Sequence, residues 1–142
     1  MHVFTYGTLM FPEVWQAVVG RPFANVGGQV TGFATYRVRD AVYPGMVAAT
    51  TLEVVQGVVY FDVDSAAVSR LDQFEDDFYR RETVPVRCDD GRICDADAYL
   101  VPPEKRAVLT EEPWSRDDFV ARDDLQHFLA RFAGFGRLML GD

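Results

Sequence analysis

One glutamate stands where its carboxyl group would be difficult to solvate. Glu75 lies at the end of a predicted second helix, four residues after Leu71. Residues four apart share a helix face, so the Glu75 carboxyl continues an apolar stripe of Val68 and Leu71 towards the core. Desolvation raises a carboxyl pKa from its ordinary value of about 4.3, which makes Glu75 a candidate general acid and base near neutral pH.

A solvated acidic helix end is the alternative interpretation of the same residues. In that case Glu75 faces water together with Asp76 and Asp77. Consecutive carboxylates at a helix C-terminus are electrostatically unfavourable, because the helix dipole prefers cations there. This cost favours a functional reason for the acidic segment, and both interpretations stay open at this level.

The N-terminal stretch forms a second candidate site, Tyr6-Gly7-Thr8-Leu9. Val3–Tyr6 is typical of a strand, and Pro12 begins an amphipathic helix shortly afterwards. A glycine turn between a strand and a helix gathers backbone N–H donors that favour a carboxylate or another anion. Gly7 would let a ligand approach the backbone, and Thr8 adds a hydroxyl. A connection that binds nothing is the alternative, since one glycine is no fingerprint.

Two tyrosines and one arginine complete the candidate residues. Pro44 fixes Tyr43 in an extended conformation that suits a phenol at a cavity rim, and Tyr79 precedes a pair of arginines. Core tyrosines with satisfied hydroxyls are the simpler interpretation of each. Arg81 is either a solvated side chain or the partner of an acid, which is Glu75 or a neighbour on the sheet.

Composition limits the class of protein. The 142 residues suffice for one domain, 1–142, and the net charge of -8 argues against nucleic-acid and anionic-membrane partners. Cys88 and Cys94 flank an Asp-Gly turn and are expected to be free thiols in a reducing cytoplasm. The spacing of His and Cys indicates no metal site, and no cofactor-binding fingerprint occurs. A cytoplasmic enzyme or binding domain is expected.

The periodicity predicts an α+β domain. Helices are expected over Pro12–Val19, from an Asp64-Ser65 cap, and from a Ser115 cap to about Phe132, and β patterns lie at Phe23–Val63, Thr83–Arg87 and Ile93–Val101. Residues 102–113 contain three prolines and are expected to be a surface connection. Repeated glycines within the first β region indicate a closed or strongly curved sheet.

Taken in order, the motifs resemble the γ-glutamylcyclotransferase-like family, in its AIG2-like and γ-glutamylamine cyclotransferase branch. The resemblance covers nearly the whole chain and rests on Tyr6–Leu9, Tyr43–Gly45, Leu71–Glu75, Tyr79–Arg81 and Trp114. It implies a compact, mixed and largely antiparallel β-barrel-like sheet flanked by a few helices. It also implies a cavity between the Tyr-Gly-Thr-Leu loop and the glutamate.

The resemblance assigns roles to individual residues. Glu75 would be the catalytic acid and base, and the γ-glutamyl group would be bound by Tyr6, Gly7, Thr8 and Leu9, with Tyr43 and Tyr79 lining the cavity. The implied reaction is attack of the substrate α-amine on its own γ-carbonyl, which releases 5-oxoproline and an amine or amino acid without metal or cofactor. Asp76 departs from the family pattern, which commonly has glycine after the glutamate, and Gly45 stands where alanine is frequent.

Other functions remain possible for such a sequence. A non-catalytic module could keep the cavity for a small anionic metabolite, and another amide-bond reaction at Glu75 could remove a γ-glutamyl protecting group. Retention of Glu75 favours an enzyme over a binder. The expected partner is a small γ-glutamyl substrate, and the chain is expected to be a monomer or a homodimer.

Overall fold

The computed structural model of the protein describes residues 1–122, 124–128 and 130. Its strands are β1 (Val3–Thr5), β2 (Asn25–Thr31), β3 (Phe33–Val38), β4 (Pro44–Ala48), β5 (Val54–Tyr60), β6 (Arg80–Cys88), β7 (Ile93–Leu100) and β8 (Leu109–Pro113). Its helices are α1 (Pro12–Val19), α2 (Ser65–Phe74) and α3 (Arg116–Ala121), with 3₁₀ turns at Thr8–Met10 and Pro103–Val108.

The sheet closes into a five-stranded barrel with additional strands at one side. Its order is β1-β5-β2-β6-β7, and a parallel pairing of β1 with β7 closes the ring. The other pairs of this ring are antiparallel. Strands β4, β3 and β8 continue the sheet from β7. The expected mixed, largely antiparallel barrel is therefore confirmed.

One edge of β7 is shared by two strands. β1 pairs with it through Val3 and Asp97, and β4 pairs with it further along, at Met46. Between these two contacts the Tyr6 hydroxyl donates a hydrogen bond to the Tyr99 carbonyl and accepts one from the Met46 N–H at 3.1 Å. A phenol thus replaces ladder hydrogen bonds where β1 and β4 diverge, so the sheet forks without leaving buried backbone groups unpaired.

Alternation along β1 divides the core into two layers. Val3 packs with the helices, whereas Phe4 points into the barrel, as expected for a strand with period two. Trp15 of α1 stacks on Tyr60 at a centroid separation of 3.6 Å, which attaches the helical layer to the barrel. Asp64 caps α2 by accepting a hydrogen bond from the Ala67 N–H, as its sequence predicts.

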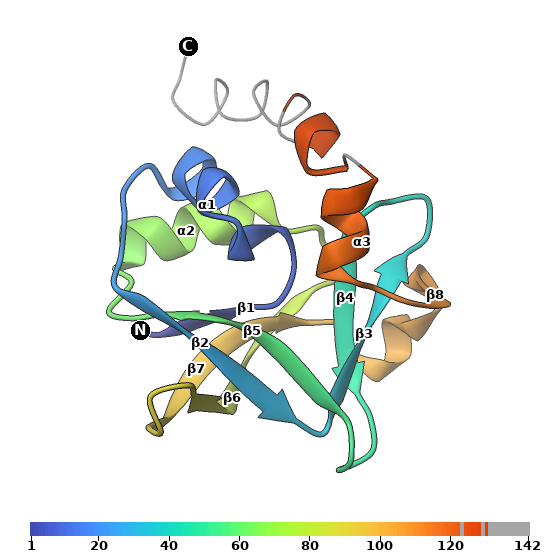
Figure 1. Ribbon diagram of the computed structural model, residues 1–142, viewed down its shortest axis with the longest axis horizontal. Helices are drawn as coiled ribbons and strands as arrows, with labels where there is room; N and C mark the ends of the chain where they lie inside the picture. Colours follow the sequence, from blue (N-terminus) through green and yellow to red (C-terminus); the bar gives the residue numbers. More distant parts are fainter. Residues whose placement is uncertain (123, 129, 131–142) are drawn as a thin grey trace.

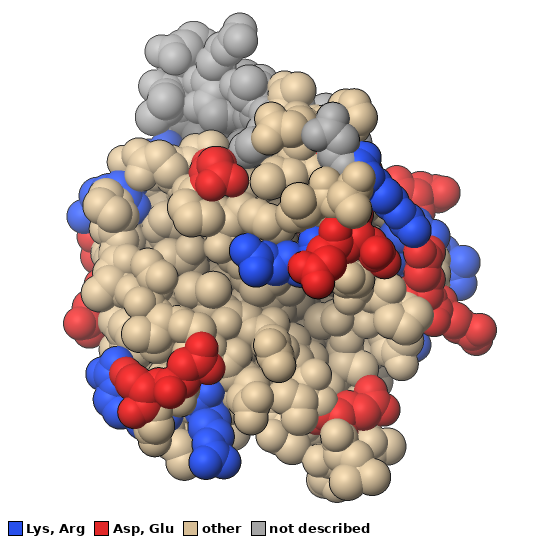
Figure 2. All heavy atoms as spheres, viewed as in Figure 1, with Lys and Arg blue, Asp and Glu red and all other residues tan. Residues whose placement is uncertain are grey.

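Figure 1 shows α1 and α2 side by side over one end of the barrel, with α3 on the same side of the sheet, next to the upper end of β4. Charged side chains of both signs intermingle near the edges of the face in Figure 2, which presents no continuous basic patch. In the described part of the chain, no helix combines the length and apolar character needed to cross a bilayer.

Two local expectations are revised or limited. The segment 102–113 is not a plain connection, because its second half forms β8, which pairs with β3. Prolines and charges concealed this strand because it lies at the sheet edge, where both are tolerated. Helical backbone follows α3 at residues 124–128, and the expected helix end at Phe132 lies outside the described residues.

Candidate active site

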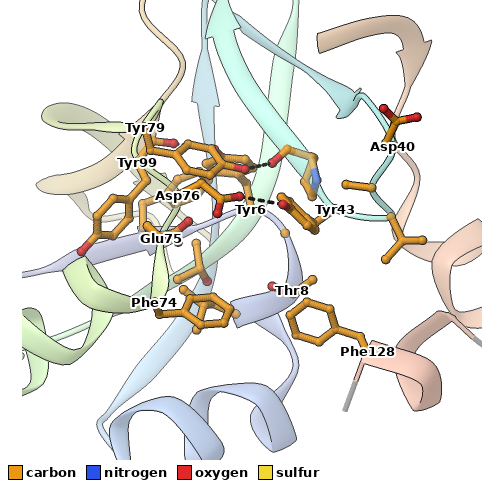
Figure 3. A pocket seen from close by; sticks show the side chains of 17 residues that line it. Tyr6, Thr8, Asp40, Tyr43, Phe74, Glu75, Asp76, Tyr79, Tyr99 and Phe128 are labelled. Carbon is orange, nitrogen blue, oxygen red and sulfur yellow. Dashed lines mark hydrogen bonds between the residues drawn. The ribbon is translucent and has the colours of Figure 1, made fainter. Parts of the chain in front are cut away.

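A cavity of about 390 Å³ opens beside the fork in the sheet. Its walls are the loop Tyr6–Leu9, the connection between β3 and β4, and the segment after α2 (Figure 3). The described lining residues are Phe4, Thr5, Tyr6, Gly7, Thr8, Leu9, Asp40, Ala41, Val42, Tyr43, Pro44, Phe74, Glu75, Asp76, Tyr79, Tyr99 and Phe128. All residues to which the resemblance assigns a role are among them, whereas the candidate Arg81 is not.

Glu75 sits one residue beyond the last turn of α2. Helix α2 ends at Phe74, and Glu75 adopts an extended conformation while its N–H still donates to the Leu71 carbonyl. Leu71 is fully buried, so this bond holds Glu75 close to the core. The interpretation of an exposed acidic end therefore applies to Asp76 and Asp77, which are exposed, whereas Glu75 is partly buried and reaches the cavity.

The surroundings keep the Glu75 carboxyl protonated near neutral pH. Burial, together with the smaller effects of the charges of Asp76 and Asp72, raises its pKa to about 8. Within the described residues, no hydrogen bond or ion pair compensates the carboxylate form of Glu75. A carboxyl group in this state can donate a proton to a ligand or, once ionised, accept one.

Gly7 is required by protein packing as well as by access to the cavity. A Cβ atom at this position would lie 2.8 Å from Cγ and 2.9 Å from Cδ of Pro44. The 3₁₀ turn Thr8–Met10 follows at once, and the first N–H groups of such a turn have no acceptor within it. The loop therefore offers backbone donors at the cavity wall, with Pro44 packed against its glycine.

The two predicted cavity tyrosines fix the walls to one another. The Tyr43 hydroxyl donates to an Asp76 carboxylate oxygen at 2.6 Å, and the Tyr79 hydroxyl donates to the Pro44 carbonyl at 2.6 Å (Figure 3). Burial raises the Tyr79 pKa well above its ordinary value. Both phenols therefore act as hydrogen-bond donors that link the segment after α2 to the β3–β4 connection.

Tyr99 is a lining residue that the motif analysis missed. Its hydroxyl donates a hydrogen bond to Asp72 at 2.6 Å, and Asp72 also accepts a hydrogen bond from Arg81 Nη1 at 2.7 Å. Arg81 Nε lies 3.4 Å from a carboxylate oxygen of Asp97 on β7. The sequence offered Glu75 or a neighbour on the sheet as a partner of Arg81. Asp97 on the sheet is a partner at the longer distance, Glu75 is not one, and the closer partner, Asp72 on α2, was not foreseen. Strand periodicity could have indicated Tyr99, because residues two apart, such as Asp97 and Tyr99, lie on the same face of β7.

The two cysteines lie close together but are not bonded. Cys88 is buried, and its sulfur lies 3.7 Å from that of Cys94 across the β6–β7 hairpin. The expectation of two free thiols is confirmed. Within the described residues, no three His, Cys, Asp or Glu side chains are arranged to hold a metal ion.

Comparison with known proteins agrees with this geometry. A family model described as gamma-glutamyl cyclotransferase, AIG2-like, matches residues 3–116. The chain belongs to this family. The matched segment contains the barrel, the loop Tyr6–Leu9 and Glu75, so the whole described cavity except Phe128 lies within the family region.

Curated AIG2-like relatives come from Arabidopsis thaliana. AIG2-like protein D is 33% identical over 92 residues, which are 64% of this chain and 60% of that protein. AIG2-like protein A is 32% identical over 120 residues, which are 81% of this chain and 72% of that protein. The match to AIG2-like protein C spans only 51% of its length, so the chain covers roughly half to two thirds of the first of these relatives.

Solved structures show the same fold. An Arabidopsis thaliana protein solved in solution superimposes with a TM-score of 0.70 at 22% identity, covering 99% of this chain and 84% of that one. A gamma-glutamyl cyclotransferase superimposes with a TM-score of 0.61 at 16% identity, covering 70% of this chain and 65% of that one. An AIG2-like protein from Mus musculus superimposes with a TM-score of 0.59 at 22% identity, covering 80% of this chain and 87% of that one.

Proposed function

We propose that the protein is a γ-glutamylcyclotransferase that uses Glu75 as its general acid and base. The observation that carries this proposal is a glutamate whose pKa is raised to about 8 at the wall of a cavity of about 390 Å³. Opposite it lies a loop with backbone N–H donors. Membership in the family supports the same reaction, and the geometry of the cavity supports the role proposed for Glu75.

The raised pKa suits the proton transfer that cyclisation requires. The neighbouring α-carboxylate raises the pKa of the substrate α-ammonium above the roughly 7.7–8.0 of a peptide N-terminus. A carboxylate with a pKa of about 8 accepts this proton at a smaller free-energy cost than a carboxylate with the ordinary pKa of glutamate. The ionised Glu75 takes a proton from the substrate α-ammonium, and the neutral amine attacks the γ-carbonyl carbon. Because amine and carbonyl belong to one molecule, holding the chain in a folded conformation supplies much of the acceleration.

Collapse of the tetrahedral intermediate returns the proton. Glu75, now protonated, donates to the leaving nitrogen as its bond to the γ-carbon breaks, and the products are 5-oxoproline and a free amine. The N–H donors of the loop beginning at Gly7 stabilise the developing oxyanion or hold the substrate α-carboxylate. The ring nitrogen still carries two hydrogens at this point. The Glu75 carboxylate takes one of them and releases it to the departing amine or to water, so Glu75 ends the cycle ionised, as it began.

Release of 5-oxoproline from γ-glutamyl amines, γ-glutamyl dipeptides and γ-glutamyl-ε-lysine tests the proposal. We expect release by the wild-type protein and loss of at least about 100-fold in Glu75→Gln, which keeps the shape and removes the acid–base group. Asp77→Asn is the matched control, because Asp77 is exposed and lies outside the described lining.

Three results would contradict the proposal. Free glutamate in place of the lactam would indicate hydrolysis. Undiminished turnover by a folded Glu75→Gln protein would exclude this residue as the acid and base. Saturable binding of γ-glutamyl compounds without any product would favour a non-catalytic binding module.

A further inference from the structure

The described wall of the cavity carries negative charge without a compensating cation. The exposed side chains of Asp40 and Asp76 line it, and among the described lining residues none is Lys, Arg or His. Arg81 approaches from the sheet but is occupied by Asp72, which accepts from it through both carboxylate oxygens at 2.7 Å. The formal charge of the described lining is therefore negative.

Asp76 holds its charge at a defined place on the exposed side of this cavity. It is exposed, whereas Glu75 is partly buried. Its carboxylate accepts the hydrogen bond from Tyr43 at 2.6 Å, and Tyr43 belongs to the opposite wall (Figure 3). The bond fixes the position of the carboxylate, and within the described part of the chain no cationic side chain forms an ion pair with Asp76.

The charges of γ-glutamyl substrates differ only in their leaving groups. The γ-glutamyl group itself carries one α-carboxylate and one α-ammonium. An amino acid leaving group adds a second carboxylate, for which the described lining offers no cation. A leaving amine that bears another ammonium group adds a positive charge, which Asp76 and Asp40 attract.

We propose that the cavity selects γ-glutamyl amides whose leaving amine carries a further positive charge, and that Asp76 is a specificity-determining residue. The inference rests on the proposed cyclotransferase function and names its substrate class. The physical reason is the difference in free energy between placing a cation and an anion beside a fixed carboxylate at the cavity rim.

Three amides of nearly equal length isolate the charge. They are the γ-glutamyl amides of 1,5-diaminopentane, of pentylamine and of 6-aminohexanoate, which end in a cation, a methyl group and an anion. We expect kcat/KM to decrease in that order, with the cationic amide preferred to the neutral one by at least about fivefold at low ionic strength. The preference should shrink in about 1 M salt, where the Debye length is only about 3 Å.

Two isosteric variants assign the preference to a residue. Asp76→Asn keeps an acceptor for the Tyr43 hydroxyl and removes the charge, so we expect the cationic-to-neutral ratio to decrease at least about twofold. Asp77→Asn removes the same charge one residue away, outside the described lining, and should leave the ratio unchanged. Because the ratio compares two substrates on one protein, any common effect of Asp76 on Glu75 cancels.

The outcomes separate the inference from the proposed function. Lactam release that is equal for the three amides, or a ratio that Asp76→Asn leaves intact, overturns the inference while the cyclotransferase stands. If no amide yields lactam, the proposed cyclotransferase function is wrong. Calorimetric binding of the same amides to the wild-type protein and to Asp76→Asn then tests whether the cavity selects a positive charge. Tighter binding of the cationic amide that depends on Asp76 supports selection, and equal binding contradicts it.

Discussion

At the scale of residues, the position of Glu75 one residue beyond α2 decides its chemistry. The helix hydrogen bond to Leu71 is retained, but the extended conformation directs the residue into the cavity rather than along the helix surface. Its neighbours Asp76 and Asp77 remain exposed. The same acidic run therefore contains one carboxyl group raised in pKa and two that face water.

The pH dependence of stability should reveal this carboxyl group. Its pKa is raised from 4.5 to about 8, so the folded state binds more protons than the unfolded state between these values. The free energy of unfolding therefore includes a contribution that is complete below about pH 4.5 and is lost as pH rises to about 8. We expect Glu75→Gln to remove this contribution. In denaturant unfolding, the free energy of unfolding of the variant minus that of the wild-type protein should therefore increase by about 1–3 kcal/mol from pH 5 to pH 9. A constant difference across that range would contradict the raised pKa.

Gly7 and Pro44 should show a strong energetic coupling. A methyl group at Gly7 would come within 2.8 Å of the Pro44 ring. We expect Gly7→Ala to lower the free energy of unfolding by about 1–3 kcal/mol, and Pro44→Ala in the same chain to recover part of that loss. A double-mutant cycle by chemical denaturation measures the coupling. Additive effects would show that another contact accounts for the glycine.

At the scale of elements, the fork between β1 and β4 creates the cavity. Two strands share one edge of β7, and the backbone groups exposed by their divergence are satisfied by the Tyr6 phenol. Burial raises the Tyr6 pKa well above its ordinary value, so this phenol stays neutral. Tyr6 lines the cavity, but its hydroxyl is already committed to the sheet.

Removing this hydroxyl should destabilise the fork. Tyr6→Phe leaves the Tyr99 carbonyl and the Met46 N–H without the partner that they share, and we expect a loss of about 1–3 kcal/mol in the free energy of unfolding. Tyr36→Phe is a suitable comparison, since its hydroxyl makes no hydrogen bond with a described residue. Thermal unfolding of both variants measures the difference, and equal melting temperatures would argue against the role of the phenol.

At the scale of the whole molecule, barrel closure depends on a close approach at Gly57. A Cβ atom there would lie 2.1 Å from the Thr5 carbonyl oxygen and 2.7 Å from the Phe4 ring. Both neighbours belong to β1, the strand that closes the barrel. A side chain at this position would therefore separate β1 from β5 and open the wall next to the cavity.

We expect Gly57→Ala to lower the free energy of unfolding by more than about 2 kcal/mol or to prevent folding. Gly27→Ala is the control in the adjoining strand, because its nearest neighbour is the carboxylate end of the exposed Asp89, which can turn aside. Comparing soluble yield and the denaturation midpoint distinguishes the two. Similar stability of the two variants would show that β1 tolerates displacement.

Local sequence determined the elements and the chemical candidates. Hydrophobic periodicity and caps placed α1 and α2, because helix ends are set by nearby residues such as Gly20 and Asp64. The ordered motifs, together with the family they resemble, named Glu75 and the loop Tyr6–Leu9. Edge strand β8 escaped detection, because its pairing with β3 comes from distant residues and not from its own pattern.

Only the tertiary structure decided how these parts act together. The parallel closure of β1 on β7, the use of the Tyr6 hydroxyl at the fork and the pairing of Arg81 with Asp72 and Asp97 all join residues far apart in the chain. Contacts of this kind depend on the three-dimensional path of the backbone, which no local pattern encodes. The raised pKa of Glu75 follows from that same packing, because desolvation is a property of the surrounding fold.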